Sequence, residues 1–307
     1  MNVSNIVSIV WSHWSFLMGI VGNSFVLYST IYHRAIKMDK LSVWIIQNLA
    51  VTDLVNSFLI LSPVIVSLYA DSQWIFGETF CKITYIYKYL GFTANVVLIN
   101  ALSFNKMVRC LSPLRNLGCS KSRRWLVTTV TAATSTIIPV FSVYRSTVDD
   151  KFAVVFSTSQ CMCSSVPVAE IGSLQKILYL VFAGSLNGLP CFTLCAMNTF
   201  LVVYALKKCN RVMDKGNIVI VLLVTTSFLV SGLPYFFYSV KHGHTSNNND
   251  AFLRVVTFIT FISLWSNPVI YLVTNKHFRT FTADYARGVS RVTMAVVQPH
   301  NQSLSRV

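Results

Sequence analysis

The sequence contains little charge. Asp, Glu, Lys and Arg make up 11% of its 307 residues, and hydrophobic residues make up 54%. Soluble domains are about a quarter charged, so an ordinary soluble globular protein is excluded and a membrane protein is indicated. No Lys or Arg precedes the first apolar run, so the basic start of a cleavable signal peptide is missing. We therefore expect that run to be a retained transmembrane helix.

Several functional signatures are also missing from the sequence. No Cys and His residues have the spacing of a metal site, and there is no glycine-rich phosphate loop and no Gly-x-Ser-x-Gly nucleophile turn. These absences argue against an enzyme and against a metal cofactor. No segment repeats with a period of roughly 20 to 50 residues, which argues against a solenoid and against a channel or transporter built from inverted repeats.

Seven long apolar segments are present instead. A helix needs ~20 apolar residues to cross a bilayer core of ~30 Å. The segments that meet this length are residues 8–32, 42–69, 80–107, 124–144, 172–206, 216–240 and 251–274. The predicted fold is an all-α membrane protein, a seven-transmembrane helix bundle. We place an extracellular N-terminus at residues 1–8, the bundle at 9–274, a short amphipathic eighth helix at 275–288 and a cytoplasmic tail at 289–307.

The positive charge lies mostly on one side of the predicted bundle. The net charge is +15, and 18 of the 25 Lys and Arg residues lie in the connections after spans one, three and five or after span seven. By the positive-inside rule this side is cytoplasmic, so the N-terminus is outside. The charge is therefore a topology signal and not a nucleic-acid surface, although it can attract anionic membrane lipid. Asn2 begins the sequon Asn2-Val3-Ser4 on the outer side, which predicts glycosylation there.

Polar side chains interrupt four of the apolar spans. Burying a polar side chain in hydrocarbon costs free energy. The four residues are Asn23, Asp53, Asn95 and Asn267. Any one alone is typical of a packing residue with local hydrogen bonds. Four of them, one an ionisable carboxylate, favour a shared polar centre. Prolines also interrupt three spans and predict kinks that can act as hinges: Pro190, Pro234 and Pro268.

Three cysteines fall on the predicted outer side. Cys81 lies at the outer end of span three, and Cys161 and Cys163 lie in the loop between spans four and five. Disulfides are permitted outside the cell, so we expect Cys81 to pair with Cys161 or with Cys163. The sequence does not choose between the two. The stretch KFAVVFSTSQCMC in that loop predicts a β-hairpin, because β-branched and apolar residues are followed by Ser/Thr turn chemistry.

Span three carries one face of large side chains in its outer half. Their spacing is i, i+3, i+4 and i+7, and they are Tyr85, Lys88, Tyr89 and Phe92. One interpretation is plain helix packing with Lys88 reaching towards the outer interface. The other is the wall of a ligand pocket. After span seven, Phe278, Phe281 and Tyr285 share a face opposite basic residues, which predicts an amphipathic helix along the inner leaflet.

The order of short motifs along the chain resembles the rhodopsin-like (class A) family of G protein-coupled receptors. The matching segments cover nearly the whole chain: Gly22-Asn23, NLAVTD at 48–53, WIFGETFC at 74–81, Trp125, Pro190, FLVSGLPY at 228–235 and NPVIY at 267–271. The resemblance implies a plasma-membrane receptor, not an enzyme. It implies an extracellular ligand, a heterotrimeric G protein and arrestin as partners, and an allosteric Na⁺ ion as the one cofactor.

The resemblance also implies an activation site at the inner side. Lys106 lies 25 residues after Cys81, about 38 Å along a helix, and the family's Asp-Arg-Tyr triplet falls on residues 105–107, which are Asn105, Lys106 and Met107. Lysine keeps the charge of the arginine but not its planar fork. We expect Lys106 to pair with Asp214 as an inactive-state latch, the alternative being two solvated charges. Other residues implied for the switch are Pro234, Pro268 and Tyr271, and for a sodium-binding polar centre Asp53, Asn95, Ser263 and Asn267.

The chain departs from the family at two further positions of the activation switch. Gly232 stands where span six normally carries a Trp, and Asn198 where span five carries a Tyr; Trp265 is a candidate to supply the missing bulk. These departures support a second hypothesis, a decoy receptor that binds ligand without signalling.

The ligand is constrained by charge. Lys88 replaces the aspartate of monoamine receptors, which disfavours a cationic amine and favours an acidic group or a C-terminal carboxylate. Phe261 replaces the lysine that attaches retinal in opsins. The resemblance adds further residues to the pocket: Phe182, Tyr235, Ser239 and Thr257. We favour a neuropeptide ligand, with a small chemosensory molecule as the alternative.

Overall fold

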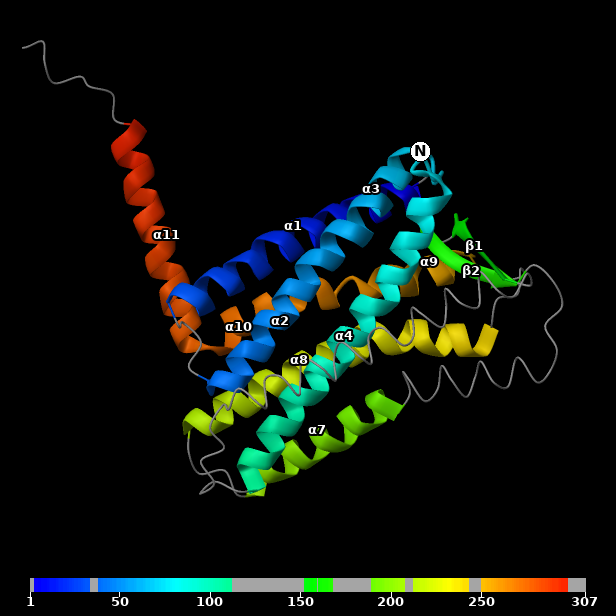
Figure 1. Ribbon diagram of the computed structural model, residues 1–307. Coiled ribbons are helices and arrows are strands. Elements are labelled where there is room, and N and C mark those ends of the chain that lie inside the picture. Colours follow the sequence, from blue (N-terminus) through cyan, green and yellow to red (C-terminus); the bar gives the residue numbers. More distant parts are fainter. Residues whose placement is uncertain are drawn as a thin grey trace, which may run out of the picture.

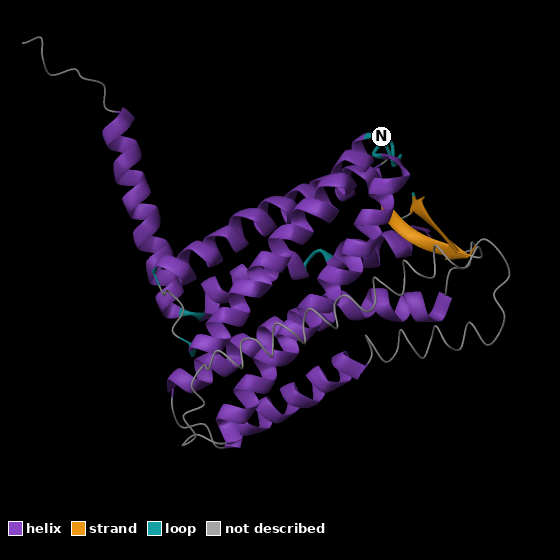
Figure 2. Ribbon diagram, viewed as in Figure 1, coloured by secondary structure: helices purple, strands orange, loops and turns teal. Residues whose placement is uncertain are grey.

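Long helices run side by side in the computed structural model, and a two-stranded hairpin lies across one end of them (Figure 1). The structure describes residues 3–33, 38–111, 152–158, 160–167, 189–207, 212–242 and 250–297. We call the end that carries the hairpin and the start of the first helix the hairpin end. The opposite end, where the last helix turns away from the bundle, is called the α11 end. Figure 2 shows that, within the described chain, strands occur only in the hairpin.

The first two spans form an antiparallel pair of long helices. Helix α1 covers Val3–Tyr32 and α2 covers Lys40–Asn56. The side chain of Asp39 accepts a hydrogen bond from the backbone N–H of Ser42 at 3.0 Å. Because an aspartate at this position satisfies a backbone N–H that has no partner within the helix, α2 begins at Lys40.

The second span contains a wider turn in its middle. A π-helical turn, η1, covers Ser57–Leu61, and α3 continues over Ser62–Tyr69. Pro63 has no backbone N–H and its ring crowds the preceding turn, and the wider turn lies directly before it. The hydroxyl of Ser62 donates to the carbonyl of Phe58, so this part of the turn keeps a hydrogen-bond partner.

Helix α4 is the longest element that the structure describes, and it runs from one end of the bundle to the other. It covers Gly77–Leu111, about 52 Å at 1.5 Å per residue. Gly77 has φ +79°, a conformation that suits glycine because it has no Cβ. Glu78 lies in the first turn, where a negative charge complements the helix dipole.

The predicted hairpin is confirmed. Strands β1, Phe152–Ser157, and β2, Met162–Pro167, are antiparallel, and Phe156 lies opposite Cys163. Cys161 lies in the turn with φ +53°.

Four further helices belong to the described part of the bundle. They are α7 at Leu189–Lys207, α8 at Val212–His242, α9 at Asp250–Thr260 and α10 at Ser263–Thr274. Among the described residues, three helices are long and apolar enough to cross a bilayer, and α9 with α10, bent by 46°, makes a fourth if the pair is one span. The expected span at 124–144 and the first part of the fifth span lie outside the described residues.

The predicted boundaries at the two ends of the chain differ from the structure. Helix α1 already begins at Val3, not near residue 8, and α11 covers Lys276–Val297 and so continues past residue 288. Asn275 ends α10 and its side chain accepts from the backbone N–H of Phe278 at 3.1 Å, which starts α11. Ring contacts hold α11 against α1, with Phe25 at 5.5 Å from Phe278 and 5.7 Å from Phe281.

The interior of the bundle is apolar around a few polar groups. The main buried cluster draws on α1, α2, α4, α7, α8, α10 and α11, and includes Val26, Ile45, Leu102 and Tyr271. Large apolar side chains are also exposed on the outside, among them Phe192 at 70% and Leu206 at 81%. Exposed apolar side chains of this kind are what hydrocarbon contact requires of a membrane bundle.

Candidate functional site

Asp53 lies at a polar centre between three helices. Its carboxylate accepts the side-chain amide of Asn95 from α4 at 2.8 Å and that of Asn267 from α10 at 3.1 Å. All three residues are buried. The structure thus brings together three of the four residues implied for the sodium site. Ser263 instead donates to the carbonyl of Thr260 at 2.8 Å.

Asn23, the fourth intramembrane polar residue, serves a different contact. Its amide donates to the carbonyls of Gly19 at 2.8 Å and Leu264 at 2.7 Å, which joins α1 to α10. One turn away, the close approach of Gly22 to Pro268 continues the same seam: a Cβ built on Gly22 would lie 2.9 Å from two carbons of the proline ring. The shared centre therefore holds Asp53, Asn95 and Asn267, while the amide N–H groups of Asn23 bond to backbone carbonyls of α1 and α10.

Lys88 joins α4 to α8 near the hairpin end. Its ammonium donates to the phenolic oxygen of Tyr235 at 3.0 Å and lies 4.7 Å from the centre of that ring. Both residues are partly buried. A cation over an aromatic face is attracted by the ring electrons, so the pair is held by two interactions with one neutral side chain. The structure thus brings together two of the predicted ligand-binding residues.

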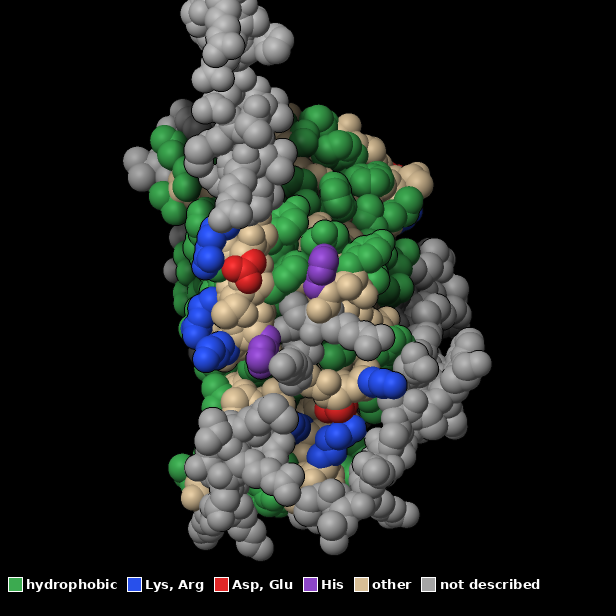
Figure 3. Space-filling model, turned by 90° about the vertical axis from the view of Figure 1, so that its left-hand side faces the viewer, with side chains coloured by type: hydrophobic (Ala, Val, Ile, Leu, Met, Phe, Trp, Pro, Cys, Tyr) green, Lys and Arg blue, Asp and Glu red, His purple; other side chains and the backbone are tan. Residues whose placement is uncertain are grey.

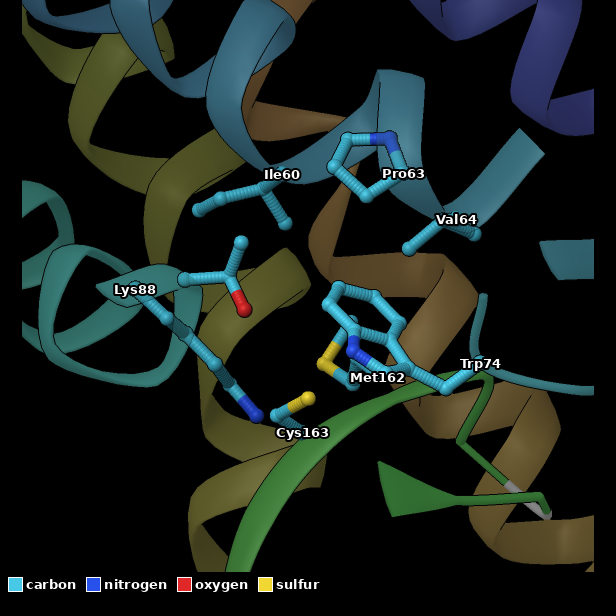
Figure 4. Close-up of a pocket in the computed structure, with 8 residues that line it drawn as sticks. Ile60, Pro63, Val64, Trp74, Lys88, Met162 and Cys163 are labelled. Carbon is cyan, nitrogen blue, oxygen red and sulfur yellow. The ribbon is translucent and has the colours of Figure 1, made fainter. Parts of the chain in front are cut away.

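Lys88 also lines a small pocket beneath the hairpin, with an empty volume of about 250 Å³ that includes its opening. Figure 4 shows the Lys88 side chain reaching towards Cys163, with Trp74 and Met162 facing the second span. The full lining is Ile60, Pro63, Val64, Trp74, Thr84, Lys88, Met162 and Cys163. The sequence analysis missed Thr84, although it lies one turn before Lys88 and the helical spacing could have found it.

The hairpin is fixed to α4 by a disulfide that resolves the open choice of cysteine. Cys81 is bonded to Cys163, with their Cα atoms 5.5 Å apart. Cys161 is a free, buried thiol. Burial raises the pKa of this thiol, and the hydrogen bond with Ser72 and the charge of Arg254 only partly oppose the effect.

Two predicted wall residues of span three pack against this hairpin. Tyr85 is 5% exposed and belongs to a cluster with Cys81, Val154 and Cys163. Tyr89 packs beside that cluster, with its ring 5.1 Å from the ring of Tyr85. Neither residue lines the pocket of Figure 4, so the expected continuous wall is divided into a Lys88 side and a hairpin side.

Phe92 faces α8 deeper in the bundle. Its ring lies 5.4 Å from that of Phe228, and a Cβ built on Gly232 would touch it at 3.4 Å. Gly232 therefore leaves the room that Phe92 occupies. Trp265 does not supply bulk at this point, because its ring lies 6.2 Å from Trp11 of α1.

Of the other four predicted pocket and glycosylation residues, the structure describes the side chain of Thr257 alone. Thr257 on α9 is 1% exposed, and no hydrogen bond to its hydroxyl oxygen is formed by the described residues. Ser239 belongs to α8, but its side chain lies outside the described part of the chain. Phe182 and the sequon residue Asn2 lie outside the described residues altogether.

Three of the residues implied for the activation switch lie at the α11 end. Asn105 and Lys106 of α4 are both buried, and Tyr271 of α10 is buried with its ring 6.5 Å from Phe278. Pro234 and Pro268 lie inside α8 and α10. The predicted Lys106–Asp214 latch is not tested, because the side chain of Asp214 lies outside the described part of the chain.

Asp39 is the acidic group that the structure does place beside this switch. It lies 3.4 Å from Arg109 and accepts from Asn105 at 2.9 Å. Burial alone would raise the pKa of the Asp39 carboxyl, but the hydrogen bonds from Ser42 and Asn105 together with the charge of Arg109 lower it below its usual 3.8. The sequence analysis missed this residue because it lies in a polar connection.

Comparison with known proteins places the chain in a large family. Residues 22–271 match the family model described as 7 transmembrane receptor (rhodopsin family). The cysteinyl leukotriene receptor 1 of Mus musculus is 26% identical over 86% of this chain and 76% of that protein. The C5a anaphylatoxin chemotactic receptor 1 of Cavia porcellus is 25% identical over 91% and 80%. The G-protein coupled receptor homolog K2 of Swinepox virus is 25% identical over 86% and 73%.

Proposed function

Because the chain belongs to the rhodopsin family of seven-transmembrane receptors, we propose that it is a receptor for an extracellular peptide whose free carboxylate binds Lys88. Members of this family are multi-pass plasma-membrane receptors, not enzymes, with an extracellular ligand and a heterotrimeric G protein as partners. The ligand class is the part that this chain's own residues must decide.

The proposal rests on the positive charge of Lys88 and its surroundings. Lys88 is partly buried, it lines the pocket beneath the hairpin, and the described residues place no carboxylate within ion-pair distance of it. A partly buried charge is stabilised when an opposite charge reaches it. An anionic group on the ligand supplies that charge, whereas a cationic amine would be repelled.

Binding of an anion at Lys88 has a direct consequence for α8. The ammonium donates to Tyr235, and Tyr235 follows Pro234, which interrupts the backbone hydrogen bonds of α8. A carboxylate that competes for the ammonium releases Tyr235 at a position next to a potential hinge. This links occupation of the pocket to movement of α8, the kind of differential contact that a ligand-driven shift requires.

A peptide is favoured over a small acid by the hairpin. Strands β1 and β2 lie across this end and are tied to α4 by the Cys81–Cys163 bond. Among the described residues the two strands pair only with each other, so an edge of the hairpin beside the pocket can pair with an extended chain. The names of two relatives refer to a cysteinyl leukotriene and to the C5a anaphylatoxin. Either size of ligand therefore occurs among similar receptors, and the test has an arm for each.

The experiment compares free-acid and amidated ligands on matched variants. Cells that express the receptor with promiscuous G proteins are exposed to a neuropeptide library, in which every peptide is present with a free carboxylate and as the amide, and to a set of small fatty acids. Active compounds are then measured on Lys88→Gln and on Lys82→Gln. Lys82 is a control on the same helix, since it is half exposed and pairs with Glu78 at 2.6 Å.

We expect free-acid peptides to activate the wild type and Lys82→Gln. Amidation or Lys88→Gln should lower potency at least tenfold, which corresponds to about 1.4 kcal/mol. Equal potency on Lys88→Gln would refute the role of the cation. Activation by the small acids alone would replace the peptide with a chemosensory ligand. Ligand binding without nucleotide exchange on the G protein would favour the second candidate, a decoy receptor. This candidate is supported by Lys106, which stands where the family carries the arginine of its Asp-Arg-Tyr triplet.

We further propose that the polar centre binds Na⁺. Carboxylate and amide oxygens suit a hard cation, and the amide oxygen of Asn95 is buried and accepts no hydrogen bond from the described residues. Asp53, Asn95 and Asn267 would hold the ion, which would supply positive charge to the buried carboxylate. Replacement of Na⁺ by N-methylglucamine should then lower the thermal stability of the wild type but not that of Asp53→Asn.

The orientation is also a proposal. The disulfide lies at the hairpin end and favours the oxidising outside, while basic side chains gather at the α11 end (Figure 3) and favour the cytoplasm. The N-terminus would then be extracellular. Arrestin binding and glycosylation of Asn2 remain predictions.

A further inference from the structure

Four side chains join α2 to α4 at the α11 end. We call the group of Asp39, Ser42, Asn105 and Arg109 the Asp39 clasp. The amide of Asn105 donates to Asp39 at 2.9 Å and contacts the hydroxyl of Ser42 at 3.0 Å, and Arg109 lies 3.4 Å from the same carboxylate. The Ser42 hydroxyl donates to the other oxygen of Asp39 at 2.9 Å. The carboxylate thus accepts bonds from both helices.

The charges and burial of the clasp make it a breakable contact. Ser42 is fully buried and Asn105 is 8% exposed, while the side chain of Arg109 is 35% exposed and that of Asp39 10%. Water reaches the arginine, so the ion pair is worth little by itself. The hydrogen bonds from Ser42 and Asn105 are sheltered, so the group as a whole favours one position of α4 without fixing it permanently.

The clasp also lies on the helix that contacts the proposed ligand. Helix α4 is continuous from Gly77 to Leu111, so Lys88 and Arg109 are separated by about 32 Å of one helix. A turn or a shift of α4 at Lys88 reaches the clasp because a helix moves largely as a rigid element. Arg109 and Asn105 would then leave Asp39 together, since both lie on α4, one turn apart.

We propose that the Asp39 clasp is a restraint that holds the end of α4 against α2, and that its release opens the α11 end of the bundle. In this chain the carboxylate comes from the connection before α2, while Asn105 on α4 is neutral. The clasp does not involve the Lys106–Asp214 pair. The role of the clasp as a gate for G protein binding rests on the proposed receptor function. Its role as a restraint on the position of α4 does not depend on that function.

The first measurement reads the position of α4 without using signalling. Cys110 is half buried and packs against the main core cluster, directly after Arg109. Its rate of alkylation by a maleimide, resolved by peptide mass spectrometry, is measured on the full chain in lipid nanodiscs. Asp39→Asn removes the charge but keeps the helix cap, because Asn caps as well as Asp. Arg109→Gln removes the other half of the ion pair.

Two further variants provide the controls. Asp39→Asn combined with Asn105→Asp exchanges the partners of the 2.9 Å hydrogen bond and puts the carboxylate one turn from Arg109, so it should restore the clasp. Asp284→Asn makes the same chemical change in an exposed ion pair, 3.6 Å from Arg287 on α11. The second measurement, on all variants, is basal nucleotide exchange on purified G protein.

The expected result is alkylation of Cys110 about tenfold faster in Asp39→Asn, the factor that loss of one charge-assisted hydrogen bond produces, and faster in Arg109→Gln. The exchanged pair should return to the wild-type rate, and Asp284→Asn should not change it. Basal nucleotide exchange should follow the same order.

An unchanged rate of Cys110 alkylation in Asp39→Asn overturns the restraint. If the Cys110 alkylation rates change as expected but no variant promotes nucleotide exchange, the restraint is supported and signalling is refuted. If the wild type promotes basal nucleotide exchange and Asp39→Asn does not raise it, the role of the clasp as a gate for G protein binding is overturned.

Discussion

The contact between Gly22 and Pro268 gives a sharp test of how α1 and α10 pack. A Cβ built on Gly22 lies 2.9 Å from two ring carbons of Pro268, about 0.6 Å closer than the lower limit of a comfortable carbon contact. The ring of Pro268 is buried and fixed to its own backbone, so it cannot rotate away. Gly22→Ala must therefore move one helix relative to the other.

The expected cost is that of an overpacked core, about 1–3 kcal/mol. Gly216→Ala is the matched control, since Gly216 also lies in a helix and a Cβ there meets none of the described residues within 4 Å. Both variants remove a flexible glycine from a helix, which by itself adds about 0.5–1 kcal/mol of stability. The difference between the two variants isolates the steric cost.

The assay is the free energy of unfolding, measured by titration with a denaturing detergent in lipid-containing micelles. We expect Gly22→Ala to be less stable than Gly216→Ala by about 1–3 kcal/mol. Equal stability of the two variants would refute the close approach. Higher stability of Gly22→Ala than of Gly216→Ala would do the same, because the steric cost at Pro268 would then be absent.

Three further predictions concern the disulfide, the Phe92 packing and Asp39. Cys163→Ser should lower stability by up to about 4–5 kcal/mol, the loop entropy of a bond across 82 residues, whereas Cys161→Ser should leave the bond intact in non-reducing mass spectrometry. Gly232→Trp should place its indole against Phe92 and lower the melting temperature, with recovery when Phe92→Ala is added; no recovery would contradict the packing. The advantage of the wild type over Asp39→Asn should be constant above pH 3.8, the unfolded pKa, and disappear as the pH falls through the lowered folded pKa, as measured by unfolding at successive pH values.

The local patterns were sufficient to predict the hairpin and the helices that the structure describes. Apolar runs are long enough to be recognised one at a time, and an apolar, β-branched run followed by Ser/Thr turn residues indicates a hairpin by itself. The grouping of Asp53 with Asn95 and Asn267 was predicted from the order of motifs along the chain, because members of one family bring the same positions of their spans together.

The parts that the sequence could not predict depend on contacts between distant residues. The choice of Cys163 over Cys161 follows from the strand register, which puts Cys163 in β2 and leaves Cys161 in the turn. The space that Gly232 leaves for Phe92 lies between α8 and α4. The sequence of either helix alone does not reveal it. The role of Asp39 was missed because a charged residue in a connection is ordinarily solvated, and its partner Asn105 is 66 residues away.

The π-helical turn at Ser57–Leu61 also affects how this chain is compared with its relatives. A π turn accommodates one residue more than an α turn, and each residue of an α-helix turns by about 100°. If a relative lacks this turn, an alignment without a gap will pair α3, from Ser62 onward, with residues on the wrong face of the helix. Pocket positions such as Val64 should therefore be transferred between receptors by structural position, after counting the additional residue.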